Sequence, residues 1–552
     1  MRMKPPQFTG LMKNRTILVL ILLIAAFLRF YQLGINPPSL AWDEAALGYN
    51  AYSIGETGRD EFGRFLPYDY FASFGDYKPP LYVYAAVIPV KIFGLNEFAV
   101  RLPSALFGTL TVLITFFLTR ELFPKLKNTC LPEIAAFFLA ISPWHTQLSR
   151  AAWEANLALF FVVLGVWLFL LSLRRQGWFL LLSSIAFVAT LYTFNSTRIF
   201  SPLLALGLLI WQWRKIWQMK KWVIAAGFLA ILLTCPLIPH LLSPEGRLRF
   251  QEVNIFTDIS VIKKSNNWIA RDDHSLWSKV IHNRRVLFSL SFLEHYFHHF
   301  EGKFLFISGD GNPKFSLQDI GQLYLFDLPF LLAGVYFFIR RREKGTFLIF
   351  WWLLAALVPA ATARETPHAL RTLNSLPTWQ IITAYGFYIF LQVIKKRKTL
   401  LKNFLFSIAA FALLVNVFYY LHNYYVHYPV EFSSEWQYGY REAIRTIAEF
   451  ENGYEKVVFT DKLGRPYIYF LFYKEYQPRD FWRFKGGVVK ETAGFIRVSN
   501  FDKYEFHNLN WHEDQLMGKT LFVMPPQDVP QNANVIKTIY RLDGEPTLVI
   551  FD

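Results

Sequence analysis

The residues best able to do chemistry in the first hundred positions are two adjacent carboxylates and a lysine. Asp43 and Glu44 follow Trp42 soon after a long apolar run, and Lys78 stands directly before two prolines. Carboxylates near a membrane surface are costly unless they are solvated, paired or functional, and a partly desolvated carboxylate can act as a general base. A lysine suits a phosphate as a point charge. The alternatives are a solvated helix start for the acids and a lysine that reaches to the membrane surface.

Two later pairs of polar residues are further candidates. Arg150 and Glu154 are four positions apart, so a helical ion pair explains them as readily as a binding role. His368 and Arg371 follow Pro367 and could hold an anionic headgroup at a helix end, or they could cap that helix. All four residues lie in polar links between apolar runs.

Three histidines have the spacing of one helix face. His295, His298 and His299 would permit a metal site, although an amphipathic helix at the membrane interface is the better interpretation. We therefore assign no metal ligand and no specific cofactor. A divalent metal is compatible with the sequence. The two cysteines, Cys130 and Cys235, indicate neither a disulfide framework nor a metal knuckle.

The elements that must position these residues are membrane helices. Hydrophobic residues make up 53% of the chain and charged residues 18%. About ten continuous apolar runs, each long enough to cross a bilayer, recur between residue 16 and about residue 421. The net charge of +16 comes mostly from short basic clusters between these runs. That pattern is typical of cytoplasmic loops, and it argues against nucleic acid as a partner, which would need the charge gathered on one folded face.

The basic clusters also predict the topology. Arg2, Lys4, Lys13 and Arg15 precede the first run, so the N-terminus should be cytoplasmic. Residues 79–94 are apolar but short, with Pro89 and Lys91 inside the run, so we interpret them as an interfacial or re-entrant segment. The expected protein crosses the cell membrane in about eleven helices, with outer loops at about 33–98 and 241–322. All the candidate residues then lie outside the cytoplasm.

The last part of the chain changes character. Apolar runs shorten to strand length at 456–461, 520–524 and 547–551, and a helical stretch at 440–449 precedes them. The expected domains are therefore a transmembrane domain over 1–421 and a small extracytoplasmic α/β domain over 422–552. The fold class is an all-α membrane domain of many spans followed by this α/β domain.

Together these motifs resemble the membrane glycosyltransferases of the GT-C fold, namely the dolichyl-phosphate-mannose–protein mannosyltransferases and the bacterial aminoarabinose transferases. The resemblance covers roughly residues 10–390. The motifs that carry it, in chain order, are W42-D43-E44, K78-P79-P80-L81-Y82, F93-G94-L95-N96-E97, R101-L102-P103-S104, S142-P143, S149-R150 with Glu154, and P367-H368 with Arg371.

The resemblance implies a transferase that moves a sugar from a polyprenyl-phosphate carrier to a lipid, glycan or protein acceptor outside the cytoplasm. It implies a catalytic role for Asp43, with Glu44 beside it, and places Glu154 where relatives have a second acid. Lys78 matches a lysine that meets the carrier phosphate, and Arg150, His368 and Arg371 are assigned to substrate binding. The residue before Lys78 is a tyrosine where some relatives have a metal-binding acid.

A single displacement, which would invert the anomeric centre, is our own inference. The carrier's long apolar tail and the surrounding membrane lipids are the other expected partners. A transporter or flippase of lipid-linked saccharides is the alternative function, but it would more often show paired repeats and charges inside the spans. A sensor or scaffold would not need this ordered set of charged residues.

Overall fold

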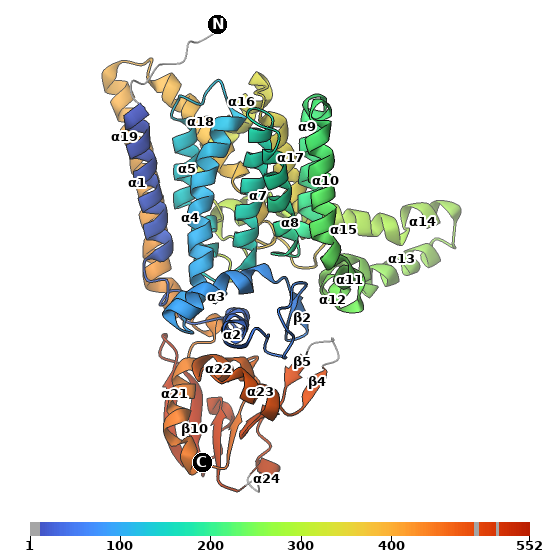
Figure 1. Ribbon diagram of the computed structural model, residues 1–552, viewed down its shortest axis with the longest axis vertical. Coiled ribbons are helices and arrows are strands. Elements are labelled where there is room, and N and C mark those ends of the chain that lie inside the picture. Colours follow the sequence, from blue (N-terminus) through green and yellow to red (C-terminus); the bar gives the residue numbers. More distant parts are fainter. Residues whose placement is uncertain (1–10, 491–495, 515–517) are drawn as a thin grey trace. The chain divides into compact units, whose positions relative to one another are not determined.

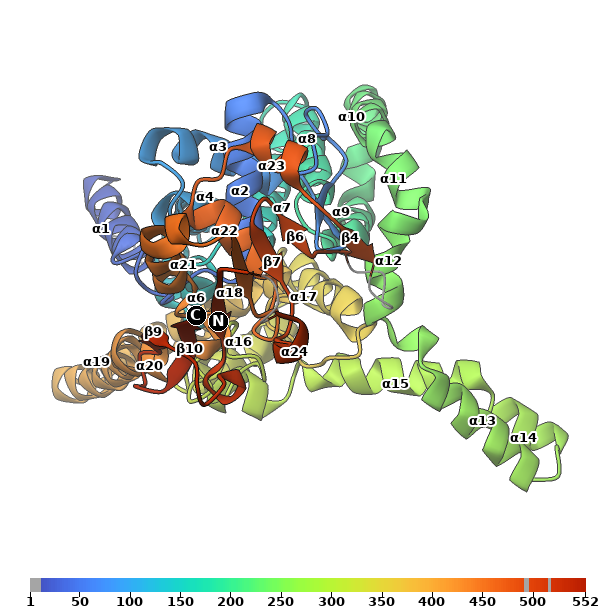
Figure 2. The same cartoon turned by 90° about the horizontal axis from the view of Figure 1, so that it is seen from below.

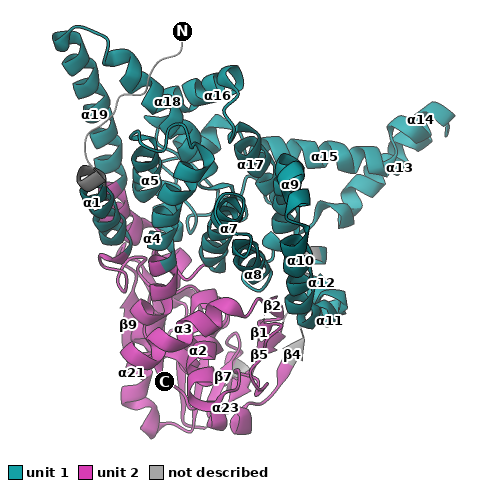
Figure 3. Ribbon diagram, turned by 45° about the horizontal axis from the view of Figure 1, so that its top comes forward, with its two compact units in different colours: residues 1–29, 107–149, 154–420 teal, residues 30–106, 150–153, 421–552 magenta. Residues whose placement is uncertain are grey.

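Helices form most of the chain in the computed structural model, which describes residues 11–490, 496–514 and 518–552. The chain divides into two units, coloured separately in Figure 3. Unit 1 comprises residues up to 29, 107–149 and 154–420, and unit 2 comprises residues 30–106, 150–153 and 421–552. The first outer loop therefore folds in the same unit as the C-terminal segment. The predicted domain boundary at residue 421 is a different division and stays a prediction.

Unit 1 is a bundle of apolar helices that run alongside one another (Figure 1). Two glycines let α16 and α18 approach closely, since a Cβ on Gly334 or Gly386 would collide with a backbone carbonyl of the other helix. Small residues at such crossings are typical of membrane helix pairs. The bundle helices are α1 (Leu11–Phe30), α4 (Glu97–Leu122, from residue 107), α5 (Leu131–Ile141), α7 (Glu154–Ser172), α8 (Phe179–Leu191), α9 (Thr197–Gln218), α10 (Lys220–Thr234), α16 (Asp327–Arg341), α17 (Thr346–Ala361), α18 (Thr378–Ile394) and α19 (Thr399–His422).

Four helical segments in the described ranges are long and apolar enough to cross a membrane: Glu97–Leu122, Glu154–Ser172, Lys220–Leu242 and Thr399–Glu431. Several other apolar helices have 10–17 residues. The chain thus has helices fit for a membrane, and the count of about eleven spans stays a prediction. Helix α3 (Leu81–Phe93) occupies the segment that we expected not to span, and its 13 residues rise only about 20 Å.

The predicted outer loop at 241–322 contains helices of its own. Helices α13 (Ile259–Arg271), α14 (Leu276–Ile281) and α15 (Arg284–His298) extend away from the bundle of unit 1 (Figures 1 and 2). Large apolar side chains on them are exposed, among them Trp277 and Leu290. An exposed apolar face beside basic residues is the pattern of an interfacial helix.

Unit 2 combines helices of the first outer loop with a small sheet. The six-stranded sheet has the order β6-β7-β3-β8-β10-β9, in which β3 is parallel to both neighbours and the other pairs are antiparallel. The predicted C-terminal strands and helix are confirmed as β3, β8, β10 and α21. The elements are β3 (Lys456–Phe459), β6 (Asn500–Phe501), β7 (Tyr504–Phe506), β8 (Thr520–Met524), β9 (Val535–Tyr540), β10 (Pro546–Phe551), α21 (Tyr440–Phe450), α22 (Pro466–Tyr473) and α23 (Pro478–Phe484).

Helix α22 packs against α2 (Trp42–Thr57) within unit 2. The approach is close because Gly48 of α2 faces the ring of Phe472, and a Cβ at residue 48 would lie 2.6 Å from that ring. The helix that carries Asp43 and Glu44 is therefore part of the hydrophobic core that the C-terminal segment completes.

Candidate active site

Asp43 and Lys78 form an ion pair in unit 2. Lys78 Nζ lies 2.9 Å from Asp43 Oδ1, and the side chains are 11% and 30% exposed, respectively. Asp43 stands in the first turn of α2, where a carboxylate is favoured by the helix dipole. The pair is thus shielded but open on the carboxylate side. The structure brings together two predicted site residues that lie 35 positions apart in the sequence.

A tight hairpin holds Lys78. Strands β1 (Phe71–Ser73) and β2 (Asp76–Lys78) pair so that Lys78 lies opposite Phe71. Phe74 and Gly75 form the two-residue turn, and both have positive φ values, 56° and 85°. Such a turn matches the twist of a hairpin, so the register and with it the position of the lysine are fixed.

Glu44 forms a different kind of pair from its neighbour. Both oxygens of Glu44 accept hydrogen bonds from Arg101, at 2.9 and 3.0 Å, and both side chains are fully buried. The backbone N–H groups of Ala41 and Ala152 donate to the same carboxylate. A carboxylate with all these donors has little capacity left for a proton from a substrate. The geometry favours a structural role for Glu44, and its predicted catalytic role stays a prediction.

Arg101 also contacts the segment before α2. Its guanidinium also donates to the carbonyl oxygens of Leu33, Pro37 and Ser39 in the segment before α2. One arginine therefore fixes the start of α2, and with it Asp43, against the beginning of α4. The sequence contained this residue in a motif without indicating its role.

Arg150 lies among backbone oxygens and tyrosines of unit 2. Its Nη2 donates to the carbonyls of Tyr31 and Asn36, at 2.7 and 2.9 Å, and its Nε donates to the hydroxyl of Tyr424. The guanidinium also lies over the rings of Tyr424 and Tyr425, 5.3 Å from each centroid. These contacts give Arg150 a structural explanation, while its predicted substrate contact stays a prediction.

The C-terminal segment contacts the chain at and just before the first residue of α2. The Tyr469 hydroxyl donates to the Leu40 carbonyl, 2.9 Å away. Gly464, at φ +101°, lies against the ring of Trp42, and a Cβ there would come within 2.8 Å of that ring. Both contacts are within three residues of Asp43, so the segment from 421 onward helps to position the candidate base.

A buried acid in the same unit escaped the sequence analysis. Glu61 accepts hydrogen bonds from the Asn50 side chain of α2, at 3.0 Å, and from the Tyr467 hydroxyl of α22, at 3.1 Å. Burial, and after it the charge of the neighbouring Asp60, raises the pKa of Glu61 to about 8 against the lowering effect of the two hydrogen bonds. Glu61 is therefore mostly protonated at neutral pH. It joins the first outer loop to the C-terminal segment.

His368 and Arg371 belong to unit 1, where a second charged cluster forms. His368 Nδ1 lies 3.6 Å from Asp310 Oδ2, and the same oxygen accepts a hydrogen bond from the Ala369 N–H at 2.6 Å. Arg371 Nη2 lies 3.9 Å from a carboxylate oxygen of Glu365. The predicted pair is thus organised by an acid 58 positions earlier than His368. In the sequence, residues 309–311 are Gly-Asp-Gly, a turn signal that gives no sign of this contact.

Asp310 has an unusual electrostatic environment. Burial raises its pKa to about 6, although backbone N–H donors from Asn312 and Ala369 and the charge of Arg371 oppose this shift. Its negative charge is therefore lost as the pH falls through about 6. Binding of an anion at this cluster would depend on the combined charge of Asp310, His368 and Arg371.

The remaining candidates do not form a metal site. Glu154 begins α7 and is buried in unit 1. His295 Nδ1 lies 2.7 Å from the Ala363 carbonyl oxygen, and His298 Nδ1 lies 3.0 Å from Thr366 Oγ1. His299 is buried. Within the ranges that the structure describes, no group of three or more His, Cys, Asp or Glu side chains is placed to hold a metal ion.

The sequence of residues 77–240 matches the family described as dolichyl-phosphate-mannose-protein mannosyltransferase. The match includes Lys78, Arg101, Arg150 and Glu154 and begins after Asp43. A Bacillus subtilis protein named "Putative mannosyltransferase YkcB" is 28% identical over 165 residues, which are 29% of this chain and 21% of that protein. This chain therefore aligns with about a fifth of that relative's length.

Solved structures extend the similarity to nearly the whole chain. ArnT from Cupriavidus metallidurans, in its apo state and bound to undecaprenyl phosphate, matches with TM-scores of 0.53 and 0.52. Each match has 11% identity and covers 98% of both chains. The archaeal oligosaccharyltransferase of Archaeoglobus fulgidus gives a TM-score of 0.48 at 15% identity, with 83% of this chain and 63% of that one covered. The predicted resemblance to the GT-C membrane glycosyltransferases is confirmed by the family match and by the fold shared with ArnT.

Proposed function

We propose that this chain, which shares the GT-C fold, transfers a sugar from a polyprenyl-phosphate-linked donor to an acceptor hydroxyl outside the cytoplasm. The observation that carries the proposal is the ion pair of Asp43 and Lys78, 2.9 Å apart and shielded from solvent on the lysine side. A base and a phosphate-binding cation side by side are what this reaction needs. The sugar transferred is a hexose or a pentose.

In the proposed reaction Asp43 accepts the proton of the acceptor hydroxyl. The hydroxyl oxygen forms a bond to the anomeric carbon, and the bond from that carbon to the phosphate oxygen breaks. The leaving group is the polyprenyl phosphate, whose developing negative charge Lys78 stabilises. Because the attack and the departure occur in one step on opposite faces, the product has the inverted anomeric configuration.

The ion pair also explains the resting state. Without a donor, Lys78 is neutralised by Asp43, so neither charge is left unpaired in a shielded position. A donor phosphate competes for the lysine and thereby releases the carboxylate for the acceptor. Binding of the donor would in this way activate the base, which limits proton transfer to the loaded enzyme.

Two supporting contacts keep the pair in place. The buried pair of Glu44 and Arg101 fixes the start of α2, and the β1–β2 hairpin fixes Lys78. Catalytic groups held by such supports lose little entropy when the substrate binds. Glu154 stays a predicted second catalytic acid, and Arg150, His368 and Arg371 stay predicted contacts of the substrate.

The test is sugar transfer by the purified full-length protein in lipid nanodiscs, with a panel of polyprenyl-phosphate sugars. Asp43→Asn should lower kcat by about 10²- to 10⁴-fold, the range for a lost general base, while donor binding persists. Lys78→Met should weaken donor binding as well as turnover. Glu56→Gln, an exposed acid at the other end of α2, is the matched control and should transfer at the normal rate.

Full activity of Asp43→Asn would remove it from the role of base, and a product with retained configuration would refute the single displacement. The proposed location has a separate test. A reporter fused after Asp552 should be accessible from outside the cell, because we propose a cytoplasmic N-terminus and an extracytoplasmic C-terminal segment in the cell membrane.

A further inference from the structure

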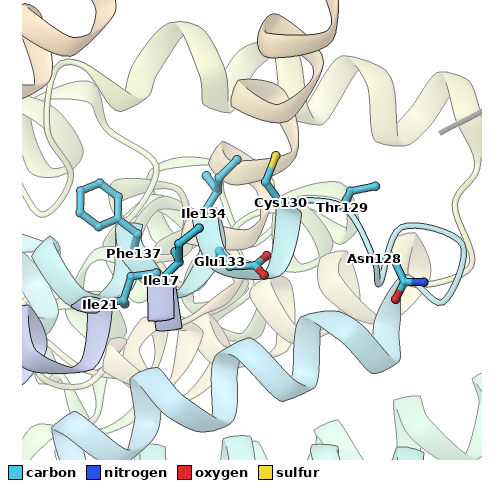
Figure 4. Close-up of a pocket in the computed structure, with 8 residues that line it drawn as sticks. All are labelled: Ile17, Ile21, Asn128, Thr129, Cys130, Glu133, Ile134 and Phe137. Carbon is cyan, nitrogen blue, oxygen red and sulfur yellow. The ribbon is translucent and has the colours of Figure 1, made fainter. Parts of the chain in front are cut away.

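A pocket of about 300 Å³ lies in unit 1 between α1 and the beginning of α5. Figure 4 shows Ile17 and Ile21 of α1 on one side and Phe137 of α5 beside them, with Glu133 at the centre of the group. The volume is about twice that of an engineered apolar cavity that binds benzene. The walls are therefore suited to a segment of a hydrocarbon chain.

One wall residue does not fit an apolar pocket. Glu133 is only 7% exposed, and its Oε2 accepts no hydrogen bond from the described residues. A buried carboxylate oxygen without a donor costs substantial free energy. Glu133 is the third residue of α5, where the helix dipole favours an acid. That explains an acid at this position but leaves Oε2 without a partner.

The segment before α5 has the opposite charge. Lys125 and Lys127 are exposed, and no acid occurs between residues 123 and 132. Asn128 of the same segment lines the pocket. An apolar pocket thus has one unsatisfied carboxylate inside it and cations close by in the sequence, a pattern that matches a zwitterion with a hydrocarbon tail.

We propose that this pocket binds a phospholipid with a primary-amine headgroup. One acyl chain lies against the isoleucines of α1 and the Phe137 ring. The ammonium group donates a hydrogen bond to Glu133 Oε2, and the phosphate is attracted by Lys125 and Lys127. The pocket shares no residue with the proposed transfer site, so the inference does not depend on sugar transfer.

The choice of a primary amine rests on hydrogen bonding. An ammonium group has three N–H donors and can satisfy Oε2 directly, whereas a choline headgroup of the same charge has none. An anionic headgroup would be repelled by the carboxylate. Comparison of ethanolamine and choline lipids with identical chains therefore isolates the contact to Glu133.

The experiment uses native mass spectrometry on the full-length protein, delipidated in detergent and titrated with phosphatidylethanolamine or phosphatidylcholine of identical chains. Wild type should bind the ethanolamine lipid about tenfold more tightly or better, as expected for a hydrogen bond to a charged group. Glu133→Gln should remove that preference while choline-lipid binding persists. Glu294→Gln, an exposed acid of α15, is the matched control and should keep the preference.

A second variant tests the pocket independently, in case Glu133→Gln misfolds. Ile17 is partly exposed at the pocket, so Ile17→Trp should narrow the pocket and weaken binding of both lipids without touching Glu133. Equal binding of the two lipids by wild type would overturn the proposal. Tighter binding of phosphatidylglycerol than of phosphatidylethanolamine would also overturn it, as would an ethanolamine preference that survives Glu133→Gln.

Discussion

Glu61 should make the stability of unit 2 depend on pH, and Glu61→Gln should remove that dependence. The pKa of this buried acid is raised from 4.5 to about 8 in the folded protein. Below pH 4.5 the acid is protonated in both the folded and the unfolded state, and stability does not change. Between the two values the unfolded state loses its proton first, so folding must take up a proton and stability falls as pH rises. Above about pH 8 the loss is complete.

The structure sets the size of this effect. Each pH unit between the two pKa values of Glu61 lowers the free energy of unfolding by about 1.4 kcal/mol. The whole interval therefore corresponds to about 5 kcal/mol. From pH 5.5 to 8.5 the expected loss is about 3 kcal/mol, because part of the interval lies below pH 5.5. The raised pKa of Asp60 adds a smaller loss in the same direction. The negative charge that Glu61 gains at high pH would act on its hydrogen-bond partners Asn50 and Tyr467. These two residues join α2 to α22.

Hydrogen exchange of peptides from α22 and α2, corrected for the intrinsic pH dependence of exchange, measures this loss locally. Wild-type protection should fall by about two orders of magnitude between pH 5.5 and 8.5, which corresponds to about 3 kcal/mol. Glu61→Gln stays neutral and should keep its protection, apart from the contribution of Asp60. Glu449→Gln, an exposed acid of α21 in the same unit, should behave as wild type. A Glu61→Gln profile with the full wild-type slope would refute the assignment of the pH dependence to this residue.

Three further substitutions test the supports of the proposed site. Arg101→Gln leaves a fully buried carboxylate unpaired and should destabilise unit 2 by about 3–5 kcal/mol, measured as lost exchange protection of α2; unchanged protection would contradict the structural role of the pair. Gly464→Ala places a Cβ within 2.8 Å of the Trp42 ring at a φ of +101°, so it should lower transfer activity more than it lowers protection of the sheet. Asp310→Asn should flatten any change in transfer activity between pH 5 and 7. The reason is that the pKa of Asp310 is about 6, so wild type loses this charge as the pH falls. A variant with the wild-type pH profile would show that the contact to His368 does not act in the reaction.

Periodicity predicted the helical bundle and the C-terminal strands because both are local properties of the chain. The strands at 456–461, 520–524 and 547–551 appear as β3, β8 and β10 with shifts of at most two residues. Asp43 and Lys78 were singled out by their residue types and by the resemblance, and both stay predicted site residues. What the sequence could not supply was their contact, which depends on the β1–β2 hairpin.

The partners of buried charges were not predictable for the same reason. Arg150 suggested an ion pair with Glu154 four residues on, yet its Nε donates to Tyr424, 274 positions later. Glu61 receives a hydrogen bond from Tyr467, 406 positions away. No local pattern marks such pairs, since they are created by packing of distant segments. Arg101 and Asp310 were visible in the sequence only as members of a motif and of a turn.

The C-terminal segment has a role that follows from these distant contacts. Tyr469 donates to the carbonyl of Leu40, and Gly464 admits the Trp42 ring, so the segment contacts the chain at and just before the start of α2, within three residues of Asp43. A C-terminal segment that only bound acceptor would not need these contacts from α22 and the loop before it. The contacts instead make the position of the candidate base depend on a segment that begins more than 370 residues later in the chain. Substitutions at Tyr469 or Gly464 should therefore alter kcat through Asp43 even where they leave donor binding intact.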